Sequence, residues 1–333
     1  MSFDWNNPWL VGIVGGVVAG IITGIVLYYL FGYRKRKEFI SIVESSVNDA
    51  DQLLEKGMEK EALAIYKELL KKVSGKSDPE LFSYIKHEVG HCYYNLADVS
   101  NKEANLTKSI HAFDEALKIY TLERYPDEYA STQNNLGTAY SGLSEVRNTE
   151  DNLTKSIHAH EEALKIRTIE KYPDEYAMTQ NNLGNDYLRL SGVRNTEDNL
   201  NKAIKAYEEA LKIRTIEKYP IDYAETQDNL GLAYGSLSEV SNKEANLTKS
   251  IHAHEEALKI YTVEKYPVDY AGTQNNLGTA YVRFSEVRNK EENLTKSIKA
   301  YEEALKIYTV EKYPENYRML KSNIDLAKEQ LDS

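Results

Sequence analysis

The chain has 333 residues and a net charge of −11 at neutral pH, with 52 acidic residues against 41 lysines and arginines. This negative charge repels phosphate backbones, so it disfavours nucleic acid as a ligand. The single cysteine, Cys92, excludes an internal disulfide framework and fits a reducing compartment.

The first apolar stretch, residues 9–31, contains no charged residue in 23 positions. A helix of that length spans about 34 Å, enough to cross a hydrocarbon core of about 30 Å. Trp5 and Trp9 stand at its beginning, where aromatic residues anchor helices at the membrane interface. The sequence therefore predicts an N-terminal transmembrane anchor over residues 1–33 and a basic juxtamembrane linker over residues 34–38.

The basic cluster Arg34–Lys37 follows the apolar stretch, whereas a cleaved signal peptide carries its positive charge first. By the positive-inside rule we expect a single-pass protein whose N-terminus lies outside and whose chain after residue 33 is cytoplasmic. Glycosylation sequons in a cytoplasmic domain are not used. We expect this of the four at Asn105, Asn152, Asn246 and Asn293.

Glycines recur every four residues along the predicted membrane helix, at Gly12, Gly16, Gly20 and Gly24. Small residues at this spacing form a glycine zipper, a face that lets helix backbones approach closely in lipid. The pattern predicts homo-oligomers through this helix, and a dimer and a larger ring fit it equally well. A helix that only anchors the chain and one that lines a pore both remain open.

The rest of the chain is one repeating unit. Its glycines recur every 47 residues, and the alanines of a second motif keep the same step. Within a unit, Leu136 and Leu143 share one helical face, and Leu153, Ile157 and Ala163 form a second apolar surface. Each unit is therefore predicted to be two helices, stacked on its neighbours in an all-α solenoid. The glycines are Gly90, Gly137, Gly184, Gly231 and Gly278.

The predicted solenoid covers residues 39–332 and ends in a capping helix over 315–332, where polar Asp325 replaces the glycine. We expect Asn148 and Thr149 to cap the second helix of their unit, and Pro173 to end it. The helix pairs are expected at about 39–73, 81–125, 127–172, 174–219, 221–266 and 268–313.

These motifs resemble the tetratricopeptide repeat. Its first helix carries leucine, glycine and tyrosine, and its second carries small, aromatic and alanine positions. In the third unit these are Leu136, Gly137, Tyr140, Ser156, His160 and Ala163. The resemblance implies a right-handed α-solenoid. The period of 47 exceeds the usual 34, which indicates longer helices like those of kinesin light chains and many prokaryotic signalling and defence proteins.

The resemblance also implies that the first helices line a concave groove, where asparagines bind the backbone of an extended peptide. An amide side chain both donates and accepts hydrogen bonds, so it pairs with a backbone of any sequence. We expect the first asparagine of each pair to be exposed. The second either contacts the ligand or braces adjacent helices. The predicted groove residues are Asn134, Asn135, Asn181, Asn182, Asp228, Asn229, Asn275 and Asn276, together with His87 and His91.

The stretch His87-Glu88-Val89-Gly90-His91 matches the H-E-x-x-H motif of zinc proteases. The repeat already explains this helix, because these residues occupy the places of Asn134 to Thr138 in the next unit. No third ligand follows at a suitable spacing. We therefore predict no metal, no cofactor and no enzymatic activity.

Together these patterns predict a membrane-anchored scaffold that binds a protein or peptide on its cytoplasmic side. One alternative is a pore-forming effector of prokaryotic antiviral defence, clustered through its glycine-rich helix. A second alternative is the zinc metalloprotease. The sequence does not identify the ligand.

Overall fold

The computed structural model describes residues 41–332. The predicted transmembrane helix over residues 9–31, its glycines Gly12, Gly16, Gly20 and Gly24, and the basic linker lie outside these residues. None of the helices between residues 41 and 332 has both the length and the apolar character that a membrane crossing requires.

The chain divides into two compact units, Met1–Cys92 and Tyr93–Ser333. In the described part of the first unit, residues 41–55 are helical and helix α2 covers Glu59–Leu69. Between them Gly57 adopts a φ of 69°, a backbone conformation that glycine reaches without strain. Helix α3, Pro79–Val99, begins in the first unit and ends in the second.

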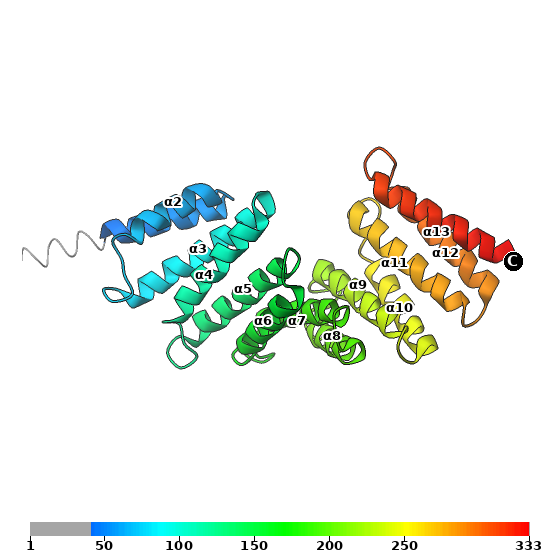
Figure 1. Ribbon diagram of the computed structural model, residues 1–333, viewed down its shortest axis with the longest axis horizontal. Coiled ribbons are helices and arrows are strands. Elements are labelled where there is room, and N and C mark those ends of the chain that lie inside the picture. Colours follow the sequence, from blue (N-terminus) through cyan, green and yellow to red (C-terminus); the bar gives the residue numbers. More distant parts are fainter. Residues whose placement is uncertain (1–40, 333) are drawn as a thin grey trace, which may run out of the picture. The chain divides into compact units, whose positions relative to one another are not determined.

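The second unit is a run of antiparallel helix pairs (Figure 1). Each helix packs on the next one along the chain, and the first helices α5, α7, α9 and α11 also contact one another in succession. The helices are α4 Lys102–Leu117, α5 Pro126–Ser144, α6 Thr149–Leu164, α7 Pro173–Ser191, α8 Thr196–Leu211, α9 Pro220–Leu237, α10 Lys243–Ala257, α11 Pro267–Ser285, α12 Lys290–Leu305 and α13 Pro314–Asp332.

The constant spacing of 47 residues between units also appears among the buried residues of the core. One leucine of each second helix is fully buried, and it packs on the leucines of the neighbouring first helices. Leu136 and Leu143, predicted from their helical spacing, belong to such a cluster together with Leu106 and Phe113. The fully buried leucines are Leu106, Leu153, Leu200, Leu247 and Leu294, of which Leu106 is 1% exposed and the others 0%.

Proline begins the first helix of each long pair from α5 onward. Pro173 is the first residue of α7, where its fixed φ suits a helix and its missing N–H costs no hydrogen bond. We expected Pro173 to end the preceding helix, but α6 already ends at Leu164. The proline therefore marks where the next helix starts.

The turn inside each pair depends on an asparagine with a left-handed backbone. Asn148 has φ 46° and ψ 49° just before α6, and its side chain makes no capping hydrogen bond, contrary to our expectation. Asparagine tolerates this conformation better than most residues with a Cβ. The left-handed backbone conformation, and not side-chain capping, thus explains why an asparagine stands at this position. The same positive φ occurs at Asn101, Asn195, Asn242 and Asn289.

A second asparagine, four residues later, closes the same turn. Asn152 is buried, and its Nδ2 donates to the Arg147 carbonyl oxygen at 2.8 Å. The sequon asparagines thus lie inside the fold, with their amide nitrogens bound to the backbone. The equivalent donors are Asn105 to Ser100, Asn199 to Arg194, Asn246 to Ser241 and Asn293 to Arg288.

Replacing Asn148 tests the backbone explanation. We expect Asn148→Ala to lower the free energy of unfolding by about 1 kcal/mol, because alanine pays the steric cost of the left-handed conformation. Asn148→Gly should change it little, since glycine adopts this conformation freely. Urea denaturation followed by circular dichroism measures both. A glycine variant as unstable as the alanine variant would indicate that the side chain itself is required.

Candidate functional site

The first helices expose one continuous face. On α7, Met178, Asn182, Asn185 and Arg189 are spaced by four, three and four residues, so they lie on the same side of the helix, and all are at least partly exposed. The equivalent residues of α5, α9 and α11 are also accessible, and these helices contact one another in order. We call this surface the first-helix face.

In the first two pairs, the two asparagines do not share this face. Asn134 and Asn181 are buried, each 3% exposed, which corrects the expectation that the first asparagine lies open in the groove. Adjacent helical residues point about 100° apart, so in these two pairs the second asparagine faces solvent, whereas in the last pair Asn275 is also partly exposed. The second asparagines, Asn135, Asn182, Asn229 and Asn276, are partly exposed.

The buried first asparagine braces adjacent units. Thr179 Oγ1 on α7 donates to Asn134 Oδ1 at 3.0 Å, and Thr226 on α9 repeats this bond to Asn181 at 3.1 Å. A buried arginine completes each bridge, since Arg214 Nη1 donates to Thr226 Oγ1 at 2.9 Å. Arg167 makes the same bond to Thr179. Sequence analysis missed these arginines, although they also recur at a step of 47 residues.

The second asparagines combine bracing with exposure. Asn229 Nδ2 donates to Asn185 Oδ1 at 3.1 Å, and Asn276 Nδ2 donates to Asp228 Oδ2 at 3.3 Å. Each amide has two donor hydrogens and two acceptor lone pairs. One bond to the neighbouring helix therefore leaves hydrogen-bonding capacity on the accessible face.

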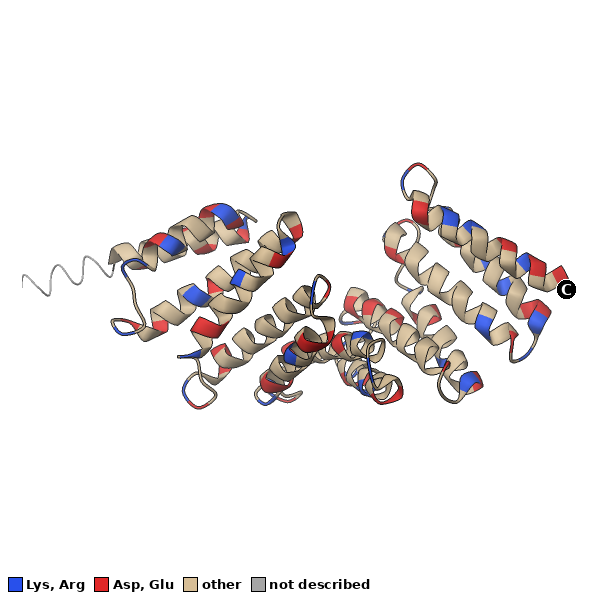
Figure 2. Ribbon diagram, in the orientation of Figure 1, with Lys and Arg blue, Asp and Glu red and all other residues tan. Residues whose placement is uncertain are grey.

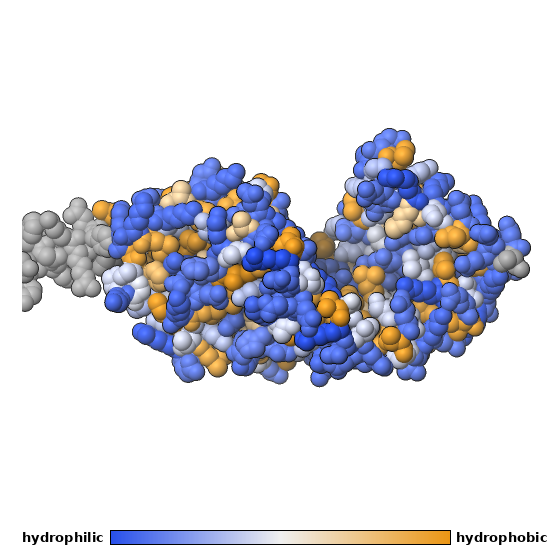
Figure 3. Space-filling view, viewed as in Figure 1, coloured by the Kyte–Doolittle hydropathy of each residue, from blue (hydrophilic) through white to orange (hydrophobic). Residues whose placement is uncertain are grey.

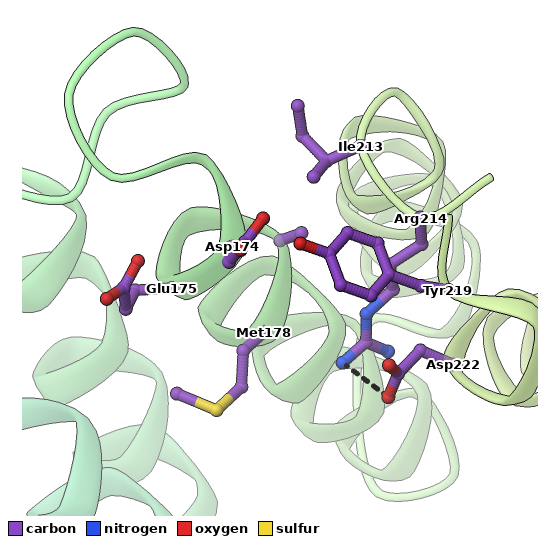
Figure 4. A pocket seen from close by; sticks show the side chains of 8 residues that line it. Asp174, Glu175, Met178, Ile213, Arg214, Tyr219 and Asp222 are labelled. Atoms are coloured by element: carbon purple, nitrogen blue, oxygen red, sulfur yellow. Dashed lines mark ion pairs between the residues drawn. The ribbon is translucent and has the colours of Figure 1, made fainter.

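A cavity of about 320 Å³ lies between the N-terminal turns of α7 and α9 (Figure 4). Met178 and the Arg214 guanidinium line it, and Arg214 Nη2 lies 3.6 Å from Asp222 Oδ1. The arginine comes from the turn after α8, so its side chain joins one pair of helices to the next. The Arg214 guanidinium in this cavity is already bound to Thr226 and faces Asp222.

Asp186 on α7 forms a buried polar cluster that sequence analysis did not single out. Ser141 Oγ on α5 donates to Oδ1 at 2.6 Å, and Ser156 Oγ on α6 donates to Oδ2 at 2.5 Å. His160 Nδ1 lies 2.9 Å from Oδ2. The cluster ties α7 to both helices of the preceding pair. The signal for it is a break in the repeat, because the corresponding residues are Ala139, Ala233 and Ala280.

Serine, histidine and aspartate also make up catalytic triads, but this cluster lacks their geometry. A triad needs the serine hydroxyl on an imidazole nitrogen. Ser156 Oγ instead lies 2.7 Å from the Gly137 carbonyl oxygen, and His160 Nε2 is buried against Gly137 without a hydrogen-bond partner. Because Ser156, His160 and Asp186 are at most 1% exposed, no substrate reaches them. The cluster stabilises the fold.

The H-E-x-x-H motif lies on α3 in the first unit. His91 Nδ1 is 4.0 Å from Glu88 Oε2, and the His91 side chain is 48% exposed. Among residues 41–332, no three His, Cys, Asp or Glu side chains are placed to hold a metal ion. Two imidazoles one turn apart supply only part of a zinc coordination shell. This part of the chain therefore offers the zinc-protease alternative no complete site.

Burial shifts the pKa values of two side chains of this motif, Glu88 and His87, in opposite directions. Burial, helped by the charge of Asp51, raises the pKa of Glu88 from 4.5 to about 7. Burial, helped by repulsion from His91, lowers the pKa of His87 from 6.5 to about 4. Each shift favours the neutral form. Glu88 thus makes folding less favourable as pH rises from 4.5 to about 7, and His87 makes it more favourable as pH rises from about 4 to 6.5.

The variant Glu88→Gln should reveal how His87 alone makes the stability of α3 depend on pH. In the wild type the two opposing effects leave the stability of α3 weakly dependent on pH between 4.5 and 6.5. In the variant, stability should rise with pH across this window. Amide hydrogen exchange of residues 81–92, corrected for intrinsic rates, provides the measurement. His87→Gln is the matched control and should show the reverse slope. Identical slopes in all three proteins would contradict the assignment.

No protein-family model and no curated protein matches the chain. Among solved structures it is similar to the Cut9–Hcn1 hetero-tetramer of APC/C, with a TM-score of 0.53 and 16% identity over 86% of this chain and 42% of that one. It is also similar to the C-terminal part of a TPR repeat-containing protein from Cytophaga hutchinsonii, with a TM-score of 0.52 and 12% identity over 86% and 93%.

The chain thus spans less than half the length of the first of these structures. At such identities the likeness concerns the fold. The described chain is an all-α solenoid of TPR-like helical repeats, as the sequence motifs predicted, with helices in tandem from residue 41 to residue 332.

Proposed function

We propose that this protein is a non-enzymatic scaffold that binds a protein or peptide on the first-helix face of α5, α7, α9 and α11. The observation that carries the proposal is the row of second asparagines, which are partly exposed at a step of 47 residues on helices that contact one another. A similar structure, Cut9–Hcn1, is a hetero-tetramer, so a fold of this class occurs in assembly with another polypeptide.

The chemistry of the face suits an extended peptide. The asparagine amides can pair with the N–H and C=O groups of a peptide backbone. This pairing does not depend on the side chains of the ligand. Helices α5 and α11 carry few charges, whereas α12 carries many (Figure 2). Met178 and Leu232 are 37% and 38% exposed and supply apolar contacts. Apolar residues are otherwise scattered among polar ones on the visible surface (Figure 3).

A membrane anchor belongs to the proposal. Its support is the uncharged stretch of residues 9–31, followed by the basic cluster Arg34–Lys37. In this arrangement the solenoid is cytoplasmic and concentrates its ligand at the bilayer. Gly12, Gly16, Gly20 and Gly24 then bring copies of the chain together in lipid.

The second asparagines test the binding face. We expect the quadruple variant Asn135/Asn182/Asn229/Asn276→Ala to lose at least one specific partner in crosslinking followed by mass spectrometry. The reason is that alanine cannot bind a peptide backbone. The matched control replaces Thr154, Asn201, Thr248 and Thr295 with alanine, because these residues are exposed on the second helices and keep the same step. An unchanged partner list, in a variant whose circular dichroism matches the wild type, would refute the binding face.

Alkaline carbonate extraction tests the anchor. The full-length protein should stay in the membrane pellet, and a chain that begins at residue 38 should move to the supernatant, because a spanning apolar helix resists removal. Protease added to sealed cells should spare the solenoid if it is cytoplasmic. Extraction of the full-length chain by carbonate, or digestion of the solenoid from outside, would contradict this part of the proposal.

A further inference from the structure

Two units fill one position of the solenoid with their own arginine. Arg167 and Arg214 are 7% and 8% exposed, and each donates to a threonine of the next first helix at 2.9 Å. Arg214 also faces the Asp222 carboxylate at 3.6 Å, as Figure 4 shows. In these two units the position therefore holds a guanidinium group that the chain itself supplies, whereas Tyr120, Tyr261 and Tyr308 stand at this position in the other units.

The next unit keeps the threonine but has a tyrosine in place of the arginine. Tyr261 stands 47 residues after Arg214, and Thr273 stands 47 residues after Thr226. Thr273 is 1% exposed, and its Oγ1 has no hydrogen-bond partner. Tyr261, Thr273 and Asp269 line a cavity of about 260 Å³. An unpartnered buried hydroxyl costs free energy unless a ligand supplies the missing bond.

The same cavity has gained negative charge. Glu225 replaces Met178, and Asp228 replaces the neutral Asn181. Both line the cavity together with Asp269, so its wall carries three carboxylates and no lysine or arginine. Burial raises the pKa of the Tyr261 hydroxyl, and these carboxylates raise it further, which is the effect of a negative local potential. Such a cavity attracts a cation.

We propose that this cavity binds the side chain of an arginine in the protein or peptide ligand. It opens beside Asn229 and Gly272, which belong to the first-helix face, so an arginine of a peptide on that face reaches it. This inference rests on the proposed function for the source of the arginine. The guanidinium lies beside the Tyr261 ring, which stands at the position of Arg214, and it donates to Thr273 Oγ1 and to the carboxylates.

The size and chemistry of the cavity select this group. It is smaller than the roughly 300–1,000 Å³ of sites for drug-sized ligands, so it accommodates a side-chain head group and not a whole metabolite. A guanidinium presents five N–H donors in a plane, which matches several acceptors at once, whereas an ammonium is a compact point charge. His254 Nδ1 lies 2.7 Å from Asp228 Oδ1 and holds this carboxylate in position.

Binding of small probes to the purified full-length protein in detergent tests the cavity without any knowledge of the ligand. The probes are N-acetylarginine N-methylamide, its lysine and citrulline counterparts, and free L-arginine. We expect the blocked arginine to shift the backbone amide signals of Gly272 and Thr273 in NMR titration. Citrulline, which has the same shape without the charge, should bind at least about tenfold more weakly, because a desolvated charge pair is lost. Free arginine should bind no better than the blocked form.

The chain offers its own blocking variant. Tyr261→Arg introduces the residue of the two preceding units, Arg167 and Arg214, so it should place a guanidinium in the cavity and abolish probe binding without lowering the melting temperature. Thr154→Arg adds the same charge to an exposed site on α6 and should leave binding unchanged. Asp228→Asn, which restores the residue of the preceding unit, should weaken binding.

The outcomes separate this inference from the proposed function. Equal binding of arginine and citrulline probes, or full binding by the folded Tyr261→Arg variant, would overturn the guanidinium site even if the asparagine variant loses its partners. Preferred binding of free L-arginine would overturn a peptide source. If Tyr261→Arg abolishes probe binding and also removes a partner that the quadruple asparagine variant removes, the inference is supported in full.

Discussion

The architecture depends on a close contact between one glycine and one aromatic ring in each helix pair from α5 to α12. A Cβ on Gly184 would lie 2.6 Å from the ring of Tyr207, and one on Gly231 would lie 2.6 Å from His254. Such distances leave no room for a side chain, so glycine lets the two helices of a pair approach to the distance that the buried leucines require. Gly137 against His160 and Gly278 against Tyr301 repeat the contact.

This contact also fixes which residues of the first helix reach the surface. With the glycine turned toward its own second helix, the first asparagine, three residues earlier, turns toward the next unit, where Thr179 and Thr226 hold it. The second asparagine, about 100° further round the helix, is left partly exposed. Packing inside the pair therefore sets the chemistry of the face that we assign to binding.

Much of this was predictable from the sequence. The step of 47 residues, the two helices per unit and the buried leucines follow from periodicity alone, because any stacked repeat must bury the same face each time. The orientation of the asparagine pair does not follow. Asn134 and Asn135 differ by a single helical step, and which of them is buried depends on the neighbouring unit. Likewise, the left-handed conformation of Asn148 and a side-chain cap demand the same residue type.

Residues that differ from one unit to the next also carry information, and they differ in what they indicate. Asp186 places a carboxylate where three other units have alanine, but two hydroxyls and an imidazole of the preceding pair satisfy it inside the core. That substitution is compensated within the protein and requires no ligand. Compared with the preceding unit, Tyr261 stands in place of Arg214 and Asp228 in place of Asn181, and Thr273 has no hydrogen-bond partner beside an open cavity. A change that leaves a buried hydrogen bond unmade in a cavity lined by carboxylates is the kind that a ligand completes. If the second asparagines bind a peptide backbone as we propose, one such cavity is sufficient to make a single position of the ligand specific.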